Sequence, residues 1–101
     1  MKTKPKPAAP AHLTARSKKL WVRLRDEYQL DDAAAEMLLL SALEARDRAD
    51  QAREAIRQAG LLVLDRFGQA RANPACALER DAHGVMVRSL RALRLAPDAL
   101  E

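Results

Sequence analysis

The sequence predicts a mainly α-helical chain of three helices, the second of them long, with a short β-hairpin between helices two and three. Over most of the 101 residues, apolar side chains recur at intervals of three and four, which is the period of a helix with one buried face. Residues 60–74 break this pattern with the apolar run 61–64, a turn that contains Gly68, and a second segment of strand length. Asn73 and Pro74 then start another helix, because Asn is a good N-cap and Pro is favoured at the first helical position.

The chain holds one domain at most and divides into three parts. Residues 1–12 contain three prolines and three lysines and are expected to form a flexible basic arm. Residues 13–96 are expected to form a helical oligomerisation core, with the hairpin at about 61–72. Residues 97–101 form a short acidic C-terminal tail.

The first helix is expected to run from Thr14, a good N-cap, to about Gln29. Its apolar face consists of Leu20, Trp21, Leu24 and Tyr28. A tryptophan beside basic residues can stack on a nucleic-acid base. The helical spacing of Trp21 from the other apolar residues instead predicts a place in the core.

The second helix is expected to begin after Asp31 or Asp32 and to end at Ala59, with Gly60 as a left-handed C-cap. Along it runs an unbroken heptad seam rich in alanine, made of Ala35, Leu38, Ala42, Ala45, Ala49, Ala52, Ile56 and Ala59. Such a seam permits close helix approach. It can pack on the other helices of the same chain or on a second copy, and one long helix can do both.

The third helix is expected from Pro74 to about Leu95, where Ala96 and Pro97 end it. Its apolar face consists of Leu78, Ala82, Val85, Met86, Leu90 and Leu93.

Two features predict a homo-oligomer. The chain has one Trp, one Tyr and one Phe, so its core is built from Leu and Ala and buries little apolar area, at roughly 25 cal/mol per Å². A two-stranded hairpin is marginal in water and needs helices, or the hairpin of another copy, to support it. The expected interface residues are Leu38, Ala42, Ala45, Ala49, Ala52, Ile56, Leu62 and Leu64.

The net charge of +4 is unevenly distributed. Residues 1–25 carry eight basic residues and no acidic one, whereas the remainder carries ten basic and fourteen acidic residues. A basic arm that continues into a helix suits an anionic polymer, of which nucleic acid is the commonest, although such an arm can also serve only for solubility. The expected DNA-binding residues are Lys2, Lys4, Lys6, Arg16, Lys18, Lys19, Arg23 and Arg25.

Catalytic signatures are absent from the sequence, which predicts a protein that is not an enzyme and has no cofactor. It has no glycine-rich phosphate loop, no G-x-S-x-G and no C-x-x-C. Cys76 and His83 could share a helix face, but without further ligands they are expected to be a buried thiol and a surface imidazole rather than a metal site. One cysteine, no long apolar run and no secretory signal predict a soluble, intracellular protein.

A set of features in a fixed order covers residues 13–97. They are Leu13-Thr14 after a Pro-rich basic tail, Trp21 and Tyr28 on the first helix, a long Ala-rich helix closed by Gly60, the hairpin, Asn73-Pro74, and a last helix that ends in Leu93-Arg-Leu-Ala-Pro97. In this order the chain resembles the small subunit of a tailed-phage terminase, of the compact type without a separate N-terminal DNA-binding domain. One departure is that Arg94 and Ala96 stand where the family usually has Gly and Ser or Thr, and residues 98–101 are acidic.

The resemblance implies a ring oligomer in the host cytoplasm that recognises double-stranded viral DNA and delivers it to the terminase large subunit, which holds the packaging ATPase and the nuclease. It also implies that the second helix and the hairpin form the contacts of the ring. The basic residues between Lys2 and Arg25 would meet DNA, and residues 95–101 would be a contact for the large subunit.

Two other classes of function remain open from the sequence. A helical scaffold protein would use the heptad seam to bind a partner helix, and its function would survive deletion of residues 1–12. A dimeric DNA-binding regulator would need a recognition helix after a tight turn. The junction at Leu30 is such a turn, but the helix after it opens with Asp31, Asp32 and Glu36, which would face phosphates badly.

Overall fold

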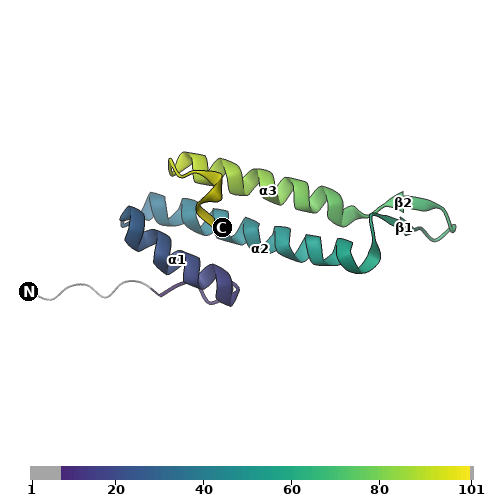
Figure 1. Cartoon of the computed structure of the whole chain (residues 1–101), viewed down its shortest axis with the longest axis horizontal. Helices are drawn as coiled ribbons and strands as arrows, with labels where there is room; N and C mark the ends of the chain where they lie inside the picture. Colours follow the sequence, from purple (N-terminus) through teal and green to yellow (C-terminus); the bar gives the residue numbers. More distant parts are fainter. Residues whose placement is uncertain (1–7, 101) are drawn as a thin grey trace, which may run out of the picture.

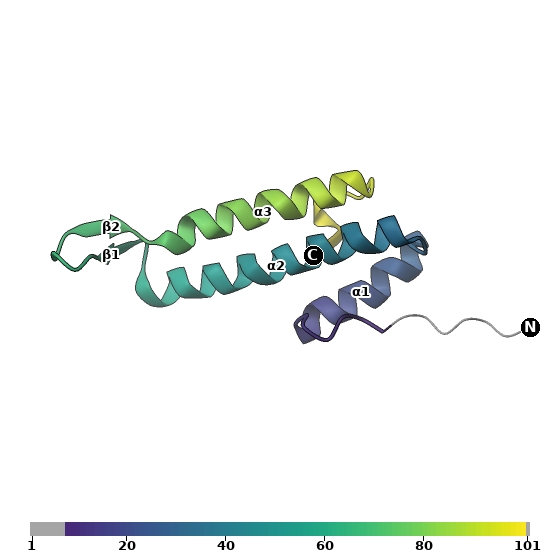
Figure 2. The ribbon, with the colours of Figure 1, turned by 180° about the vertical axis from the view of Figure 1, so that it is seen from behind.

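The computed structural model describes residues 8–100, except for the side chains of residues 97 and 98. Two antiparallel helices, α2 (Ala33–Ala59) and α3 (Pro74–Ala92), form the long body of the molecule. Helix α1 (Ala15–Tyr28) packs on the first half of α2, and the 3₁₀ helix η1 (Pro97–Leu100) folds back at the same end (Figure 1; seen from behind in Figure 2). Strands β1 (Leu62–Leu64) and β2 (Ala70–Ala72) project from the opposite end. The mainly helical fold with a hairpin between helices two and three is thus confirmed.

The three helices begin where their capping residues predict. Thr14, Asp32 and Asn73 are extended residues whose side-chain oxygens each accept a hydrogen bond from a backbone N–H two or three residues later, at 3.2, 2.7 and 3.0 Å. Each cap satisfies one of the N–H groups that the first turn of a helix leaves without a partner. Pro74 stands in the first turn of α3, where its missing N–H costs nothing.

Helices α1 and α3 end in the same motif, which uses a left-handed residue other than glycine. Gln29 has a φ of 51° and Arg94 a φ of 62°. The next residue in each case bonds back to the carbonyl five residues earlier, Leu30 to Arg25 at 3.1 Å and Leu95 to Leu90 at 2.8 Å. This is the Schellman arrangement, in which glycine is the usual left-handed residue.

The end of α2 differs from the prediction. Gly60 caps the helix and its N–H bonds to the Ile56 carbonyl at 2.7 Å. Its φ of 88° is positive as expected, but its ψ of 173° is extended rather than left-handed helical. The chain therefore leaves α2 straight into the hairpin instead of turning back, which is why glycine is needed here. The predicted end of α3 was also a few residues late, since the helix stops at Ala92.

The large apolar side chains are concentrated at the end of the molecule where α1, α2, α3 and η1 meet. The cluster contains Leu13, Leu20, Trp21, Leu24, Leu30, Ala35, Leu39, Ala42, Leu43, Leu90, Leu95 and Leu100. Trp21 is 4% exposed, which confirms its place in the core. Two residues expected on apolar faces are exposed instead, Tyr28 at 47% and Leu78 at 63%.

The other half of the α2–α3 pair, which α1 does not cover, has a different interior (Figure 1). Its buried apolar residues are the alanines Ala49, Ala52, Ala75 and Ala82. Alanine allows the two helices to approach closely but contributes little buried area. We call this part, together with the hairpin, the distal half.

The hairpin has one apolar face. Leu62 pairs with Ala72 and Leu64 with Ala70, so these four side chains lie on the same side of the two strands. Asp65 organises the turn, because its side chain accepts from the N–H groups of Phe67 and Gln69 and from Arg71. The leucines remain uncovered, with Leu62 65% and Leu64 74% exposed.

Candidate nucleic-acid and assembly surfaces

The predicted DNA-binding residues that the structure describes lie on α1, and Lys2, Lys4 and Lys6 lie outside the described residues. Arg16 and Lys19 are exposed and Lys18 is half-buried. Among the described side chains, which leave out residues 97 and 98, none of these three makes an ion pair or a hydrogen bond. They are therefore available to an anion in solution.

Arg23 and Arg25 are bound to other parts of the chain. The Arg23 guanidinium donates to the carbonyl oxygen of Ala99 at 2.9 Å and lies 3.7 Å from Glu27. Arg25 is 8% exposed, which corrects the expectation that it faces DNA. Burial and the contacts described next leave it little surface for a phosphate.

Arg25 holds the α1–α2 corner together. Its guanidinium donates to the Leu30 carbonyl at 3.2 Å and to Glu36 at 2.9 Å. It also lies 5.6 Å from the centre of the Trp21 ring, within the range of a cation–π contact. This side chain therefore joins the first helix, the turn and the second helix.

The chain before α1 is attached to the middle of α2. His12 lies 2.8 Å from Glu44, and Leu13 is 4% exposed. The backbone N–H and the hydroxyl of Thr14 both donate to Asp47, at 3.0 and 2.9 Å. Of the expected flexible arm, residues 1–7 lie outside the described residues, and residues 8–12 run up to this attachment point.

Asp47 is a buried carboxylate with several donors. Burial raises its pKa, but hydrogen bonds from Ser17 and Thr14, together with the charge of Arg46, outweigh that effect and hold the pKa below its usual value. Burial, followed by the nearby charge of Arg16, lowers the pKa of Arg46. The Nη1 atom of Arg46 is buried without a hydrogen-bond partner and lies 4.0 Å from Asp50.

The heptad seam packs mainly inside the chain. Ala42 and Ala45 have no exposed surface, and Ala49 and Ala52 are each 6% exposed. Leu38 and Ile56 are half-buried. Most of the seam is therefore buried in the single chain, and the parts of it with exposed surface are the half-buried Leu38 and Ile56 and the exposed Ala59. Of the eight expected interface residues, Leu62 and Leu64 are the exposed ones.

A groove opens between α2 and α3 on the distal half. Its volume is about 430 Å³, and its lining residues are Arg48, Gln51, Ala52, Ala55, Ala75, Leu78, Asp81, Ala82 and Val85. The floor is apolar and the edges carry one charge of each sign. This surface was not expected from the sequence, because the spacing of Leu78 predicts a core position, whereas Leu78 lies at the edge of the groove and is exposed.

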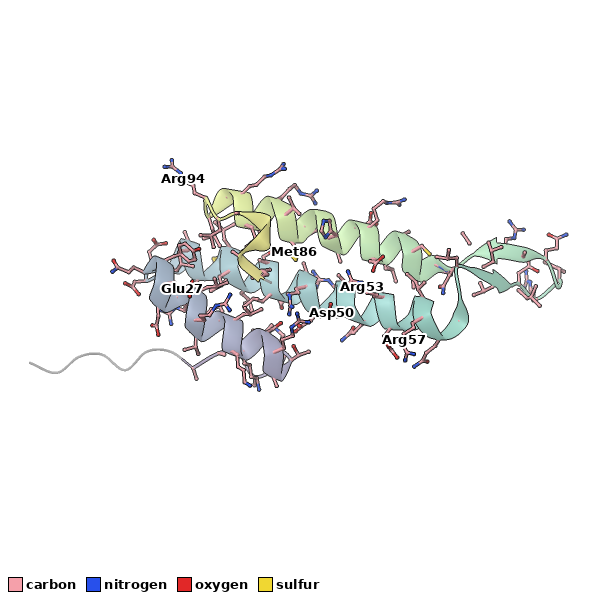
Figure 3. All side chains as sticks on the ribbon, viewed as in Figure 1. Glu27, Asp50, Arg53, Arg57, Met86 and Arg94 are labelled. Atoms are coloured by element: carbon pink, nitrogen blue, oxygen red, sulfur yellow. The ribbon has the colours of Figure 1, made fainter. Side chains whose placement is uncertain are left out.

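The outer side of α3 carries a second group of cations that was not expected from the sequence. Arg80, Arg88, Arg91 and Arg94 are all exposed. Arg94 points away from the helices at the end of α3 (Figure 3). The sequence signal was the spacing of Arg88, Arg91 and Arg94, three residues apart. We call these four residues the α3 arginine row.

The C-terminal segment is part of the fold. Leu100 is 3% exposed and belongs to the main apolar cluster, and the Ala99 carbonyl accepts from Arg23. Residues 97–100 of the acidic tail predicted from the sequence form η1, which lies against the helices.

Two general properties can be stated for the described part of the chain. Between residues 8 and 100, His, Cys, Asp and Glu side chains form no group of three that could hold a metal ion; Cys76 is half-buried and His83 exposed. No helix in this range combines the length and apolarity needed to cross a bilayer.

Comparison with known proteins found no matching family model, no matching curated protein and no matching solved structure.

Proposed function

We propose that this protein is a non-catalytic DNA-recognition and assembly subunit, the small subunit of a tailed-phage terminase. It would form a ring in the host cytoplasm, bind double-stranded viral DNA and deliver that DNA to the large subunit. The resemblance along residues 13–97 supplies the family. The exposed apolar face of the hairpin is the observation that carries the assembly part of the proposal.

The hairpin supports assembly because a monomer leaves it uncovered. Leu61, Leu62, Leu64 and Phe67 are all between 65% and 74% exposed, and they lie together at one end of the molecule. Several exposed large apolar side chains in one element of a small protein usually mark an interaction site. A second copy is the occupant we favour, because the distal half also lacks the large core residues that stabilise the other half.

The groove beside the hairpin offers a second surface for the same assembly. It is concave and apolar, whereas the hairpin is convex and apolar, and both belong to the distal half. Two different surfaces on one chain permit a head-to-tail contact, which closes into a ring when the rotation between subunits allows it.

DNA binding would rest on avidity. Arg16 and Lys19, with the lysines of residues 1–7, provide a few phosphate contacts per chain, and each subunit would bind weakly. A ring brings many such contacts to one duplex.

Because η1 packs on the helices, a contact with the large subunit through residues 95–101 would use the outer surface of that segment or displace it.

The proposal is tested by native mass spectrometry combined with DNA binding at two salt concentrations. A closed oligomer that binds duplex DNA, with affinity falling as salt rises, is the expected result. A protein that stays monomeric at all concentrations would contradict the assembly part. Binding that is indifferent to salt, or no binding, would contradict the DNA part.

One observation favours a helical scaffold protein as the second candidate. The α2–α3 groove is of the size and character that accepts apolar side chains of a partner helix. Under this alternative, deletion of residues 1–12 leaves function intact, whereas under the terminase proposal the deletion removes most DNA binding. The same deletion variant therefore separates the two.

A further inference from the structure

We propose that the α3 arginine row is a second binding surface for the phosphate backbone of duplex DNA, separate from the N-terminal arm and α1. This inference rests on the proposed DNA-binding function and adds to it the place where the duplex lies along the subunit. It is carried by the exposure of the four arginines, by the alignment of the three helical ones on one face of α3, and by the lack of acidic partners for three of the four among the described side chains.

The row lies on the side of α3 that faces away from the rest of the chain. Residues 80, 88 and 91 are separated by eight and three positions, which places them within one side of a helix at 100° per residue. The buried residues Ala82 and Ser89 lie on the opposite side, toward α2. From Arg80 to Arg91 the row extends for about 16 Å at 1.5 Å per residue.

Arg94 extends the row beyond the end of the helix. Its backbone is left-handed and is fixed by the bond from the Leu95 N–H to the Leu90 carbonyl at 2.8 Å. In Figure 3 its side chain points outward from the body. The position that normally takes glycine thus holds an arginine, which adds a charge at the carbonyl end of the helix, where a cation is favoured.

Most charges of the row have no acidic partner among the side chains that the structure describes. Among the side chains that the structure describes, which lie in residues 8–96 and 99–100, those of Arg88, Arg91 and Arg94 make no ion pair or hydrogen bond. Arg80 has Asp81 at 3.7 Å, and both of these side chains are more than 70% exposed. In contrast, Arg53, Arg57 and Arg71 each have a carboxylate within 3.0 Å. Exposed guanidinium groups on one side of a helix that lack counter-charges attract a polyanion and release its counterions on binding.

Gly84 shapes the middle of the row. A Cβ atom at this position would lie 3.1 Å from Nη1 of Arg88, so glycine leaves room for the Arg88 guanidinium to lie along the helix. Its charge lies near the helix surface rather than far out in solvent.

A duplex fits this surface better than a membrane does. A helix that lies on a membrane inserts an apolar face between the lipids. At this end of α3, Leu90 has no exposed surface, Met86 and Leu93 pack against the main cluster, and Val87 is half-buried. A line of cations about as long as several phosphate repeats instead matches the backbone of DNA, where one strand carries a charge every 3.4 Å or so.

The test compares three triple variants in the full chain, all with arginine or lysine replaced by glutamine. The row variant carries Arg88→Gln, Arg91→Gln and Arg94→Gln. The arm variant carries Lys2→Gln, Lys4→Gln and Lys6→Gln. The control variant carries Arg53→Gln, Arg57→Gln and Arg71→Gln, which removes the same charge from exposed but ion-paired arginines. Circular dichroism and native mass confirm that each variant folds and assembles like the parent.

The readout is the slope of log K against log salt for a fluorescent duplex, measured between about 50 and 200 mM salt. We expect the row variant to bind more weakly and its slope to become shallower by about 0.9 for each phosphate that the protein no longer neutralises. The control variant should keep a slope close to that of the parent.

Each outcome decides one of the two claims. A row variant that behaves like the control variant, while the arm variant loses affinity, would overturn the second surface and leave the proposed DNA-binding function standing. A parent protein that does not bind the duplex would overturn both. If the slope of log K against log salt becomes shallower in the row variant and also in the arm variant, the two surfaces each contact DNA phosphates.

Discussion

The hydroxyl of Ser17 donates a 2.5 Å hydrogen bond to the carboxylate of Asp47, and Ser17 has no exposed surface. This contact joins the first turn of α1 to the middle of α2. The same carboxylate also receives the N–H and the hydroxyl of Thr14, the N-cap of α1. One side chain on α2 thus fixes both the start and the position of the first helix.

The substitution Asp47→Asn is expected to destabilise the protein by about 1–3 kcal/mol at neutral pH. Asparagine lacks the negative charge that strengthens the three hydrogen bonds from Thr14 and Ser17. Its NH2 group also cannot accept, so one of these donors loses a good acceptor. Urea unfolding followed by circular dichroism measures the effect. Asp81→Asn is the matched control, because Asp81 is exposed, and it should change stability by less than about 0.5 kcal/mol.

The same carboxylate predicts a pH dependence. Because the pKa of Asp47 is lower in the folded protein, its contribution to stability is present above the unfolded value, near 3.8, and is lost as pH falls through the folded value. The difference in unfolding free energy between the parent and Asp47→Asn should therefore shrink as pH falls below about 4. A difference that stays constant down to strongly acidic pH would show that the charge of Asp47 is not what stabilises its contact with the start of α1.

Gln29, the left-handed residue after α1, gives a prediction about replacing glutamine by glycine. The replacement should raise stability at Gln29 and lower it at Gln51. Gln29→Gly should stabilise the protein by about 0.5–1 kcal/mol, because glycine adopts a φ of 51° without the strain of a Cβ atom. Gln51→Gly, in the exposed interior of α2, should destabilise by about 1 kcal/mol. Thermal unfolding of both variants checks the pair, and a loss of stability in Gln29→Gly would show that its side chain has a role beyond the cap.

Local signals predicted most of the fold. Thr14, Asp32 and Asn73 cap helices because their side chains satisfy nearby N–H groups, and this depends on a few consecutive residues. The turn at Gly68 was predictable for the same reason, since its hydrogen bonds are local to residues 65–69.

The exposure of a side chain and its contacts with distant parts of the chain depend on how the helices pack on one another. The sequence did not predict these features. Leu78 has core-like spacing, yet it is 63% exposed, because in the distal half α3 packs on α2 alone among the described elements and buries alanines against it. Arg25 appeared to belong to a basic stripe, but Glu36 and the Leu30 carbonyl, brought near by the α1–α2 turn, draw it inward. In the sequence, the α3 arginine row shows only as the three-residue spacing of Arg88, Arg91 and Arg94. Its significance depends on the absence of acidic partners among the described residues, which only the structure reveals.

Arg25 and Lys19 are both basic residues of α1, but their substitution should have different effects. Arg25→Ala is expected to destabilise the protein by roughly 2 kcal/mol or more, because it removes buried packing and leaves Glu36 without its cation. Lys19→Ala should leave unfolding unchanged within about 0.5 kcal/mol and should weaken DNA binding. Unfolding and DNA-binding measurements on both variants separate the roles, and a stable Arg25→Ala variant with weak DNA binding would restore Arg25 to the DNA surface.

The hairpin gives the sharpest prediction for assembly. Leu64→Lys should leave the fold of the single chain intact, since Leu64 is 74% exposed and contacts no helix core. The same change should abolish or strongly weaken self-association, because a lysine placed in an apolar interface must be desolvated. Native mass spectrometry and sedimentation velocity at several concentrations measure the oligomer, and circular dichroism measures the fold.

Met37→Lys is the matched control for this experiment. Met37 is 73% exposed and lies on α2 at the end remote from the hairpin, so the new charge has the same size and starts from a similar environment. Oligomers that survive Met37→Lys but not Leu64→Lys would place the contact on the hairpin. If both variants assemble like the parent, the apolar face of the hairpin is not the subunit contact, and the groove between α2 and α3 becomes the surface to test next, with Leu78→Lys.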